Sequence, residues 1–175
     1  MTLEKIERPK PKDKQEILRE IITNNRIFEE VKIAQSKAKG KIKVGCAVEA
    51  LEYRGEYDYS FFFYGANIHV SDSFGDTHAE RMAIDQALKE TCYPVTVYVT
   101  STSDDEKVAL CGSCRHYISE INENCNIVVF NPDGSIKLVS TIKEMYPNHK
   151  NVEEKNQKFF EMCLAGRDDK NERQL

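Results

Sequence analysis

The stretch THAERMAIDQAL, residues 77–88, predicts the start of a helix in the middle of the chain. Thr77 and Glu80 have the Thr-x-x-Glu spacing of a capping box, in which each side chain hydrogen-bonds a backbone N–H group of the first turn. His78, however, stands two residues before Glu80, and a Cys-x-x-Cys pair follows later in the chain. Glu80 could therefore cap the helix or transfer protons at a metal site, but one carboxylate cannot do both.

Helical and strand patterns alternate on both sides of this helix. Apolar residues recur at helical spacing across 13–38, and two runs typical of strands, 44–53 and 57–66, are separated by a short turn that predicts a hairpin. The other expected elements are strands at 95–101, 126–130 and 135–140 and helices at 110–121, 141–147 and 151–164. This order indicates an α/β domain with a mixed sheet of about five strands.

Length, composition and charge indicate one globular domain. The chain has 175 residues, 40% of them hydrophobic and 31% charged, and a formal net charge of −4, values that suit a packed core rather than disorder. No apolar run approaches the ~20 residues that a membrane helix needs. The opening MTLEKIERPKPKDK lacks the apolar core of a signal peptide. We therefore expect a cytoplasmic protein with no membrane partner.

The acidic balance also argues against a nucleic-acid partner, because domains that bind nucleic acids usually carry a basic excess. The basic exception is the segment KAKGKIK, which contains Lys37, Lys39, Lys41 and Lys43. We expect this segment to form a solvated turn between a helix and a strand. Contact with a phosphate group or a single strand is the alternative.

Six cysteines in a chain without a targeting segment are expected to be thiols, since the cytosol keeps cysteines reduced. Four are isolated among apolar or helical neighbours and are expected to be small buried hydrophobic residues: Cys46, Cys92, Cys125 and Cys163. Cys111 and Cys114 differ, because their spacing can hold one metal ion.

His78, Cys111 and Cys114 together provide the donors that zinc prefers, an imidazole nitrogen and two thiolate sulfurs. All three stand at or just before expected helix starts, where positive partial charge stabilises thiolates. Three protein ligands leave a fourth position open, as in catalytic zinc sites. Glu80 could then move a proton from water to a substrate nitrogen. We expect its carboxylate to face the metal, with Thr77 alone capping the helix.

Other interpretations of these residues are open at this point. His78 could be a surface histidine, Glu80 a helix cap, and the Cys pair a redox or structural motif. A redox pair of thioredoxin type is expected after the first strand of a βαβ unit, whereas this pair follows the third expected strand. A structural zinc would need His116 as a fourth ligand, and its position two residues after Cys114 would strain the helix.

These motifs together resemble the cytidine deaminase family. The order His-x-Glu and then Cys-x-x-Cys is the zinc deaminase pattern. Further segments similar to family motifs are KVGCAV, YGANIHV, HAERMAI, CGSCRHYISE and the closing NPDGSIKLVSTIKEMYP. The resemblance implies a three-layer α/β/α cytidine-deaminase-like fold with a mixed five-stranded sheet over residues 13–148. A flexible N-terminal arm at 1–12 precedes this domain, and a C-terminal helical extension with a charged tail at 149–175 follows it.

The resemblance implies a hydrolase that deaminates cytidine, deoxycytidine or a close cytosine nucleoside analogue to the uracil product and ammonia. Such a reaction belongs to nucleoside metabolism and pyrimidine salvage. One zinc ion per chain, held by His78, Cys111 and Cys114, would activate water, and Glu80 would be the catalytic proton carrier. The backbone N–H of Ala79 would hold the carbonyl of the cytosine ring.

The expected sugar site departs from the family pattern. Asn67 matches the residue that binds a sugar hydroxyl, but His69 stands where the family has a ribose-binding glutamate, and an imidazole cannot replace a carboxylate as a pure acceptor. Ile42 replaces an aromatic residue, Leu110 a proline and His116 a glutamine. Alternative functions are therefore deamination of a blasticidin-S-like or nucleotide substrate, or an inactive zinc-binding scaffold with the deaminase fold.

Two further expectations come from the family. Arg81 and Arg115 would temper the charge of the thiolates, although Arg81 could equally be a packed surface residue. The family is oligomeric, so a homo-oligomer, a dimer or a tetramer, is expected, with loops of neighbouring subunits closing each site.

Overall fold

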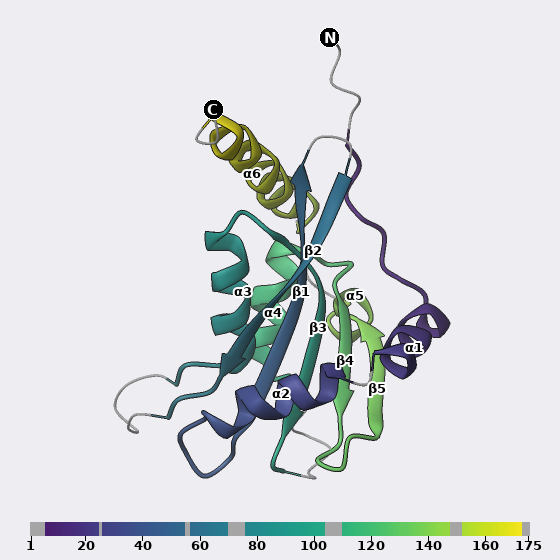
Figure 1. The fold of residues 1–175 in the computed structure, drawn as a ribbon, viewed down its shortest axis with the longest axis vertical. Helices are drawn as coiled ribbons and strands as arrows, with labels where there is room; N and C mark the ends of the chain where they lie inside the picture. The colour runs from purple at the N-terminus through teal and green to yellow at the C-terminus, as the bar shows by residue number, and fades with distance from the viewer. Residues whose placement is uncertain are drawn as a thin grey trace.

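Five strands form one mixed sheet that helices cover on both faces (Figure 1). The computed structural model describes residues 6–24, 26–54, 57–69, 76–103, 110–147 and 152–172, and all five strands lie in this part of the chain. None of the helices described there combines the length and the apolar character that crossing a membrane requires.

The sheet has the spatial order β2-β1-β3-β4-β5. The strands are β1 (Val44–Arg54), β2 (Tyr57–Ala66), β3 (Tyr93–Ser101), β4 (Asn126–Phe130) and β5 (Ile136–Thr141). Strands β3 and β4 are parallel, and the other neighbours are antiparallel. The predicted hairpin is confirmed as the β1–β2 pair, and β4 has the predicted bounds. The parallel pair at the centre requires the crossover through the helix between β3 and β4.

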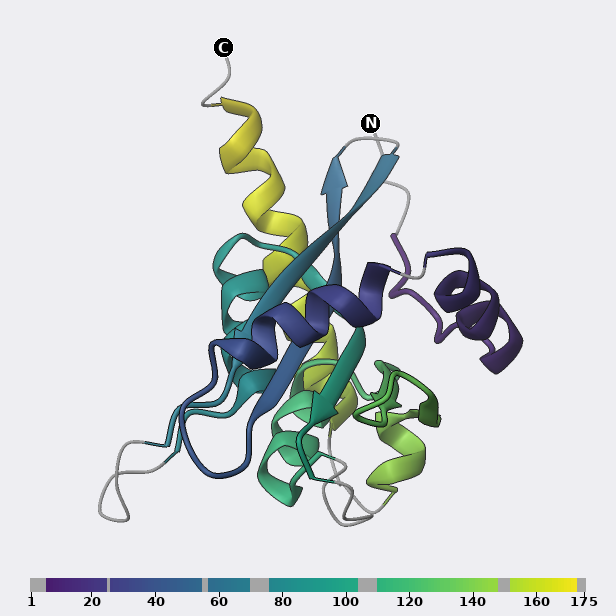
Figure 2. The same ribbon diagram turned by 60° about the horizontal axis from the view of Figure 1, so that its bottom comes forward.

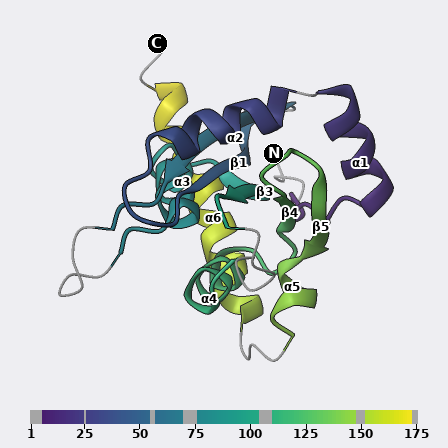
Figure 3. The same cartoon turned by 90° about the horizontal axis from the view of Figure 1, so that it is seen from below.

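Helices form the two outer layers, as Figure 3 shows when the sheet is seen from one end. They are α1 (Lys14–Thr23), α2 (Arg26–Ser36), α3 (Ala79–Lys89), α4 (Gly112–Ile121), α5 (Ile142–Met145) and α6 (Val152–Glu172). Residues of α1 and α2 share a core with one face of the sheet, which includes Ala47 and Tyr98. Residues of α3, α4, α5 and α6 share the core on the other face, which includes Cys46 and Val48. The predicted three-layer α/β/α architecture is therefore confirmed.

Two expected helices differ from the sequence prediction. The periodic stretch 13–38 is broken at Asn24, whose backbone N–H still bonds to the carbonyl of Glu20 and so closes α1. Asparagine has a low helix propensity, which explains a break that the apolar spacing did not indicate. At the other end, α6 continues to Glu172, although the residues after 164 were expected to form a charged tail. No proline interrupts this segment, and its Arg, Lys and Glu residues favour a helix.

The C-terminal helix packs into the same core as α3 and α4, and Figure 2 shows its first half passing behind the sheet. Phe160 is fully buried, and its ring meets those of Tyr53 and Tyr93 edge to face at centroid distances of 5.3 and 5.1 Å. Asn156, also fully buried, accepts a hydrogen bond from the N–H of Glu123 and donates one to the carbonyl of Ser119. The hydrogen bonds of Asn156 tie α6 to the end of α4, and the ring of Phe160 packs α6 against β1 and β3.

Removing the Phe160 ring is expected to destabilise the whole domain, because it leaves a cavity between two buried tyrosines. Phe160→Ala should lower the free energy of unfolding by about 3–5 kcal/mol, the usual range for a buried phenylalanine. Denaturant unfolding measures this change. Met162→Ala is the control on the same helix, since Met162 is 52% exposed, and a surface change should cost less than about 0.5 kcal/mol. Equal stability of both variants would contradict the packing of α6 on the core.

Candidate metal centre

A backbone contact between β2 and α3 sets the position of the site. A Cβ atom added to Gly65 in β2 would lie 2.0 Å from the carbonyl oxygen of Ala79, so only glycine allows this approach. Just before the helix, the backbones of Ile68 and Thr77 exchange two hydrogen bonds of 3.0 Å. The chain is thus fixed on both sides of His78.

The start of α3 has no side-chain cap. His78 is the N-cap residue and makes no capping hydrogen bond, and Thr77 uses its backbone in the bridge to Ile68. The expectation that Thr77 caps this helix is therefore wrong: the N-cap position is occupied by His78, and Thr77 lies one residue before it. The first N–H groups of a helix lack intrahelical partners, and the structure records no partner for the N–H of Ala79 among the described residues.

Glu80 does not close a capping box. Its carboxyl group interacts with its own backbone N–H and with the thiol of Cys114, and only 5% of the residue is exposed. Burial raises the pKa of Glu80, although its own N–H, His78 and Cys114 act in the opposite direction. The side chain therefore turns toward the cysteine pair on α4.

His78, Cys111 and Cys114 form the cluster that their spacing indicated. Their ligand atoms all lie within 4.8 Å of one another, and Cys111 Sγ is 3.4 Å from His78 Nδ1. Cys111 is also the N-cap of α4, where its sulfur accepts a hydrogen bond of 3.3 Å from the N–H of Cys114. Two segments 33 residues apart thus place one imidazole and two thiols around one point.

The electrostatics of the cluster suit a cation. Burial raises the pKa of the Cys114 thiol, and Glu80 and Cys111 raise it further. A metal ion at this point would stabilise the thiolate, since metal binding releases the thiol proton. Two sulfurs and one nitrogen are donors of the kind and number that a catalytic zinc site uses. The residues present therefore fit zinc.

A cavity of about 290 Å³ opens onto the cluster. Its apolar wall consists of Val44, Val99 and Leu110. Its polar lining residues are Asn67, Asp76, Thr77, His78, Glu80 and Cys111, with Ala79 beside them. A mostly apolar wall with a few convergent polar groups is typical of a small-molecule site.

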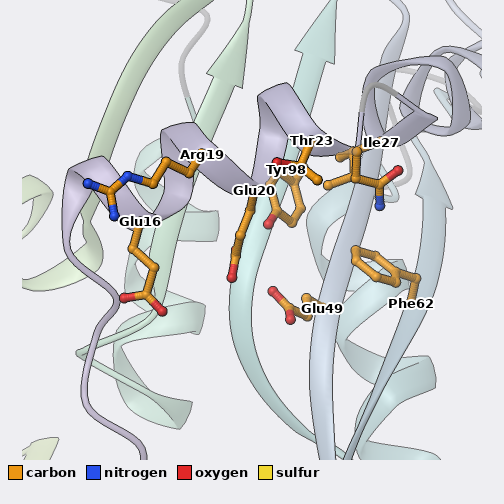
Figure 4. Close-up of a pocket in the computed structure, with 9 residues that line it drawn as sticks. Glu16, Arg19, Glu20, Thr23, Ile27, Glu49, Phe62 and Tyr98 are labelled. Carbon is orange, nitrogen blue, oxygen red and sulfur yellow. The ribbon is translucent and has the colours of Figure 1, made fainter.

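A second cavity, of about 420 Å³, lies on the opposite face of the sheet, between the α1–α2 segment and the strands (Figure 4). Its lining includes Tyr98 and the carboxylates of Glu20 and Glu49. Lys12 Nζ lies 2.8 Å from Glu20 and 3.2 Å from Glu49, so the chain itself compensates these charges. None of the three predicted metal ligands reaches this cavity, and we take it as a structural feature.

Two of the three predicted substrate-binding residues, Asn67 and Ala79, line the first cavity, and His69 does not. Ala79 lines it and is fully buried. Asn67 also lines it, but its amide accepts a hydrogen bond from the N–H of Val44 (2.7 Å) and donates one to the carbonyl of Ile42 (2.9 Å). His69 is not among the lining residues. Its Nδ1 atom contacts the carboxylate of Asp76, which does line the cavity.

Asp76 is the cavity residue that sequence reasoning missed. It stands in the loop segment NIHVSDSFGD, where acidic and small residues are ordinary loop composition. The backbone bridge between Ile68 and Thr77 brings it to His69, seven positions earlier, and no motif spacing indicates such a pair.

The residues that depart from the family pattern are placed as follows. Leu110 is buried in the cavity wall, and Ile42 is 44% exposed. The His116 ring contacts Tyr146, outside the His–Cys–Cys cluster. Its predicted unsuitability as a fourth ligand therefore agrees with its position.

The two arginines near the cluster make other contacts. Arg81 Cζ lies 4.8 Å from the ring centroid of Tyr117, and Arg115 Nη1 donates to the carbonyl of Met145 at 3.4 Å. The Nε atoms of both arginines are buried without a hydrogen-bond partner in the described part of the chain. Their effect on the thiolates stays a prediction.

Comparison with known proteins identifies the fold. No protein-family model matches the chain. A cytidine deaminase from Burkholderia pseudomallei aligns with 71% of this chain and 96% of its own, with a TM-score of 0.60 and 23% identity. The enzyme from Bacillus anthracis aligns with 81% and 99%, with a TM-score of 0.55 and 14% identity. The enzyme from Mycobacterium leprae aligns with 69% and 93%, with a TM-score of 0.50 and 19% identity.

The chain therefore has the fold of the cytidine deaminases, as the sequence resemblance implied. Within this fold it brings a His–Cys–Cys cluster and a buried glutamate to one cavity.

Metal analysis tests the cluster directly. Protein purified without chelators is expected to contain about one zinc ion per chain, and Cys114→Ser should lose it, because a hydroxyl is a much poorer zinc ligand than a thiolate. Cys163→Ser, which changes a buried thiol of α6, is the matched control and should retain the metal. Zinc retained by Cys114→Ser, or absent from the unaltered protein, would contradict the site.

A glycine pair tests how the site is positioned. Gly65→Ala forces α3 away from β2 and should reduce the zinc content and cost about 1–3 kcal/mol of stability, the usual cost of overpacking. Gly112→Ala is the control, because Gly112 lies between the two cysteine ligands and has no atom within 4 Å of an added Cβ. Zinc content and thermal unfolding measure both effects. Equal metal loss in both variants would show that the glycine contact does not position the cluster.

Proposed function

We propose that this protein is a zinc-dependent aminohydrolase that deaminates cytidine, deoxycytidine or a close cytosine nucleoside analogue. The observation that carries the proposal is that His78, Cys111 and the buried Glu80 line one cavity, and that Cys114 completes a His–Cys–Cys cluster with the first two. This arrangement occurs within a fold shared with proteins that are cytidine deaminases. The products would be the uracil nucleoside and ammonia.

His78, Cys111 and Cys114 would hold the zinc ion, which when bound supplies the Lewis acidity that makes water a nucleophile near neutral pH. The carboxylate of Glu80 accepts a proton from the water that attacks C4 of the ring. It delivers this proton to ring N3, then takes the second proton from the hydroxyl group now on C4 and passes it to the amino group. The C4–N bond breaks, the C4 carbonyl forms and ammonia leaves. The burial of Glu80 favours this exchange, because a raised pKa brings a carboxyl group closer to the operating pH.

The uncapped start of α3 provides the contact that orients the ring. The N–H of Ala79 points from the first turn of a helix, where the helix dipole favours a negative partner. The ring carbonyl of cytosine is such a partner, and it gains negative charge as the reaction proceeds. A capping side chain at Thr77 or Glu80 would compete for these N–H groups.

A nucleotide substrate is the second candidate, and the placement of the KAKGKIK segment favours it. The backbone of Lys39 accepts a hydrogen bond from the N–H of His69 and donates one to the carbonyl of Asn67, each of 3.0 Å. A basic loop is thus fastened beside the residues that the resemblance assigns to the sugar. A phosphate on the sugar would need the lysines of this loop as its partners.

The test measures turnover of cytidine, deoxycytidine, CMP and blasticidin S, which is monitored by the loss of ultraviolet absorbance. Glu80→Gln is expected to lower kcat by at least about 10²–10⁴-fold, the share that general acid–base catalysis contributes, while zinc stays bound. Glu90→Gln at the other end of α3 is the matched control and should leave turnover unchanged. Turnover of none of these substrates by zinc-loaded protein would favour an inactive scaffold and contradict the proposal.

A further inference from the structure

The cavity contains a second carboxylate, Asp76, which no step of the proposed reaction uses. Asp76 lines the cavity four residues before Glu80, but the two differ in burial: 46% of the Asp76 side chain is exposed, against 5% of Glu80. Glu80 therefore lies deep beside Cys114, and Asp76 lies toward the solvent. A ligand whose reacting ring reaches Glu80 would present its substituent to Asp76.

His69 fixes the direction of this carboxylate. An Asp carboxylate is purely an acceptor when it is ionised, so the hydrogen in the contact belongs to His69 Nδ1, which donates to Oδ1 of Asp76. His69 is held in turn by the hydrogen bond from its N–H to the carbonyl of Lys39, and Gly40 lies directly against its side chain. A Cβ atom on Gly40 would be 3.0 Å from His69 Cβ. The second carboxylate oxygen, Oδ2, has no donor recorded among the described residues.

We propose that Asp76, positioned by His69, accepts a hydrogen bond from a hydroxyl group of the sugar attached to the cytosine ring. This inference rests on the proposed deaminase function and names the feature of the substrate that the site selects. Position 69 carries an imidazole instead of a carboxylate acceptor, and the Ile68–Thr77 bridge places the carboxylate of Asp76 beside it. His69 is a positioning residue and does not itself meet the sugar.

The geometry favours a hydroxyl over a phosphate at this place. Asp76 is part of the cavity wall, whereas Lys39, Lys41 and Lys43 are not among its lining residues. An anionic group brought next to Asp76 would meet a like charge, which is unfavourable, whereas a hydroxyl can donate to the carboxylate oxygen that His69 leaves open. The site would thus select nucleosides over nucleotides as substrates for deamination.

The test compares Asp76→Asn with the matched control Asp58→Asn, which alters an exposed aspartate in the β1–β2 hairpin. Asp76→Asn should raise KM for cytidine about tenfold or more and leave kcat within about twofold, since a hydrogen bond to a charged group is being weakened. For 1-methylcytosine, whose substituent has no hydroxyl group, kcat/KM should not change. The Kd of uridine, measured by calorimetry without turnover, should rise with KM. Asp58→Asn should match the unaltered protein in every assay.

His69 variants separate positioning from simple structure. His69→Ala should raise KM for cytidine, and His69→Asn, which keeps an N–H donor, should restore part of the loss. His69→Glu should raise KM as well, because it places two carboxylates side by side. Improved use of cytidine by His69→Glu would overturn the inference, since it would put the sugar acceptor at position 69.

Three further results would also overturn it. Cytidine and 1-methylcytosine could lose the same factor in Asp76→Asn, or KM and the uridine Kd could stay unchanged. The unaltered protein could instead prefer CMP, with Asp76→Asn improving its use. If cytidine is deaminated normally in any of these cases, the proposed function stands and only the role of Asp76 falls. If the zinc-loaded protein neither deaminates cytosine nucleosides nor binds uridine, the proposed function falls and this inference falls with it.

Discussion

The approach of one backbone to another at Gly65 is the constraint on which the site depends. Because the carbonyl of Ala79 occupies the space that a Cβ atom would need, α3 can lie directly on β2 only where glycine stands. The helix start, and with it His78 and Glu80, is therefore fixed relative to the sheet. Gly45 plays the same part on the opposite face, where an added Cβ would lie 2.3 Å from the carbonyl of Val31 in α2. Both outer layers therefore meet the sheet at glycines, and the contact at Gly65 positions the candidate metal ligand His78.

The start of α3 departs from the local rules for helix starts. Its sequence could form a capping box, yet Thr77 is used in a backbone bridge and Glu80 turns to Cys114. The helix therefore forgoes the roughly 0.5–2 kcal/mol that a good N-cap contributes. In exchange, an N–H donor and a buried carboxyl group face the same cavity. Local rules that fail together at one place are expected at a functional site, where the rest of the fold supplies the missing stability.

Most of the fold could be predicted from the sequence, because alternation and motif spacing are local properties. The β1–β2 hairpin and β4 follow from alternating apolar residues, and the His–Cys–Cys cluster follows from its residue types and spacing near helix starts. The break at Asn24 was missed, because apolar periodicity continues through it. The pairing of His69 with Asp76 was missed for a different reason: it follows from the backbone bridge between Ile68 and Thr77, which neither residue type nor spacing indicates.

The charge of the cavity links the fold to substrate choice. Two thiolates and one neutral imidazole would balance a divalent ion, so the metal cluster itself would add no net charge to the cavity. The carboxylate of Asp76 then contributes negative charge to the cavity wall, and the lysines of KAKGKIK lie outside this wall. A neutral sugar suits this arrangement better than a phosphate, although the chain contains a basic loop close by. Substrate choice would thus depend on the carboxylate of Asp76 and on His69, which orients it. The chemical step would depend on the residues at the starts of α3 and α4.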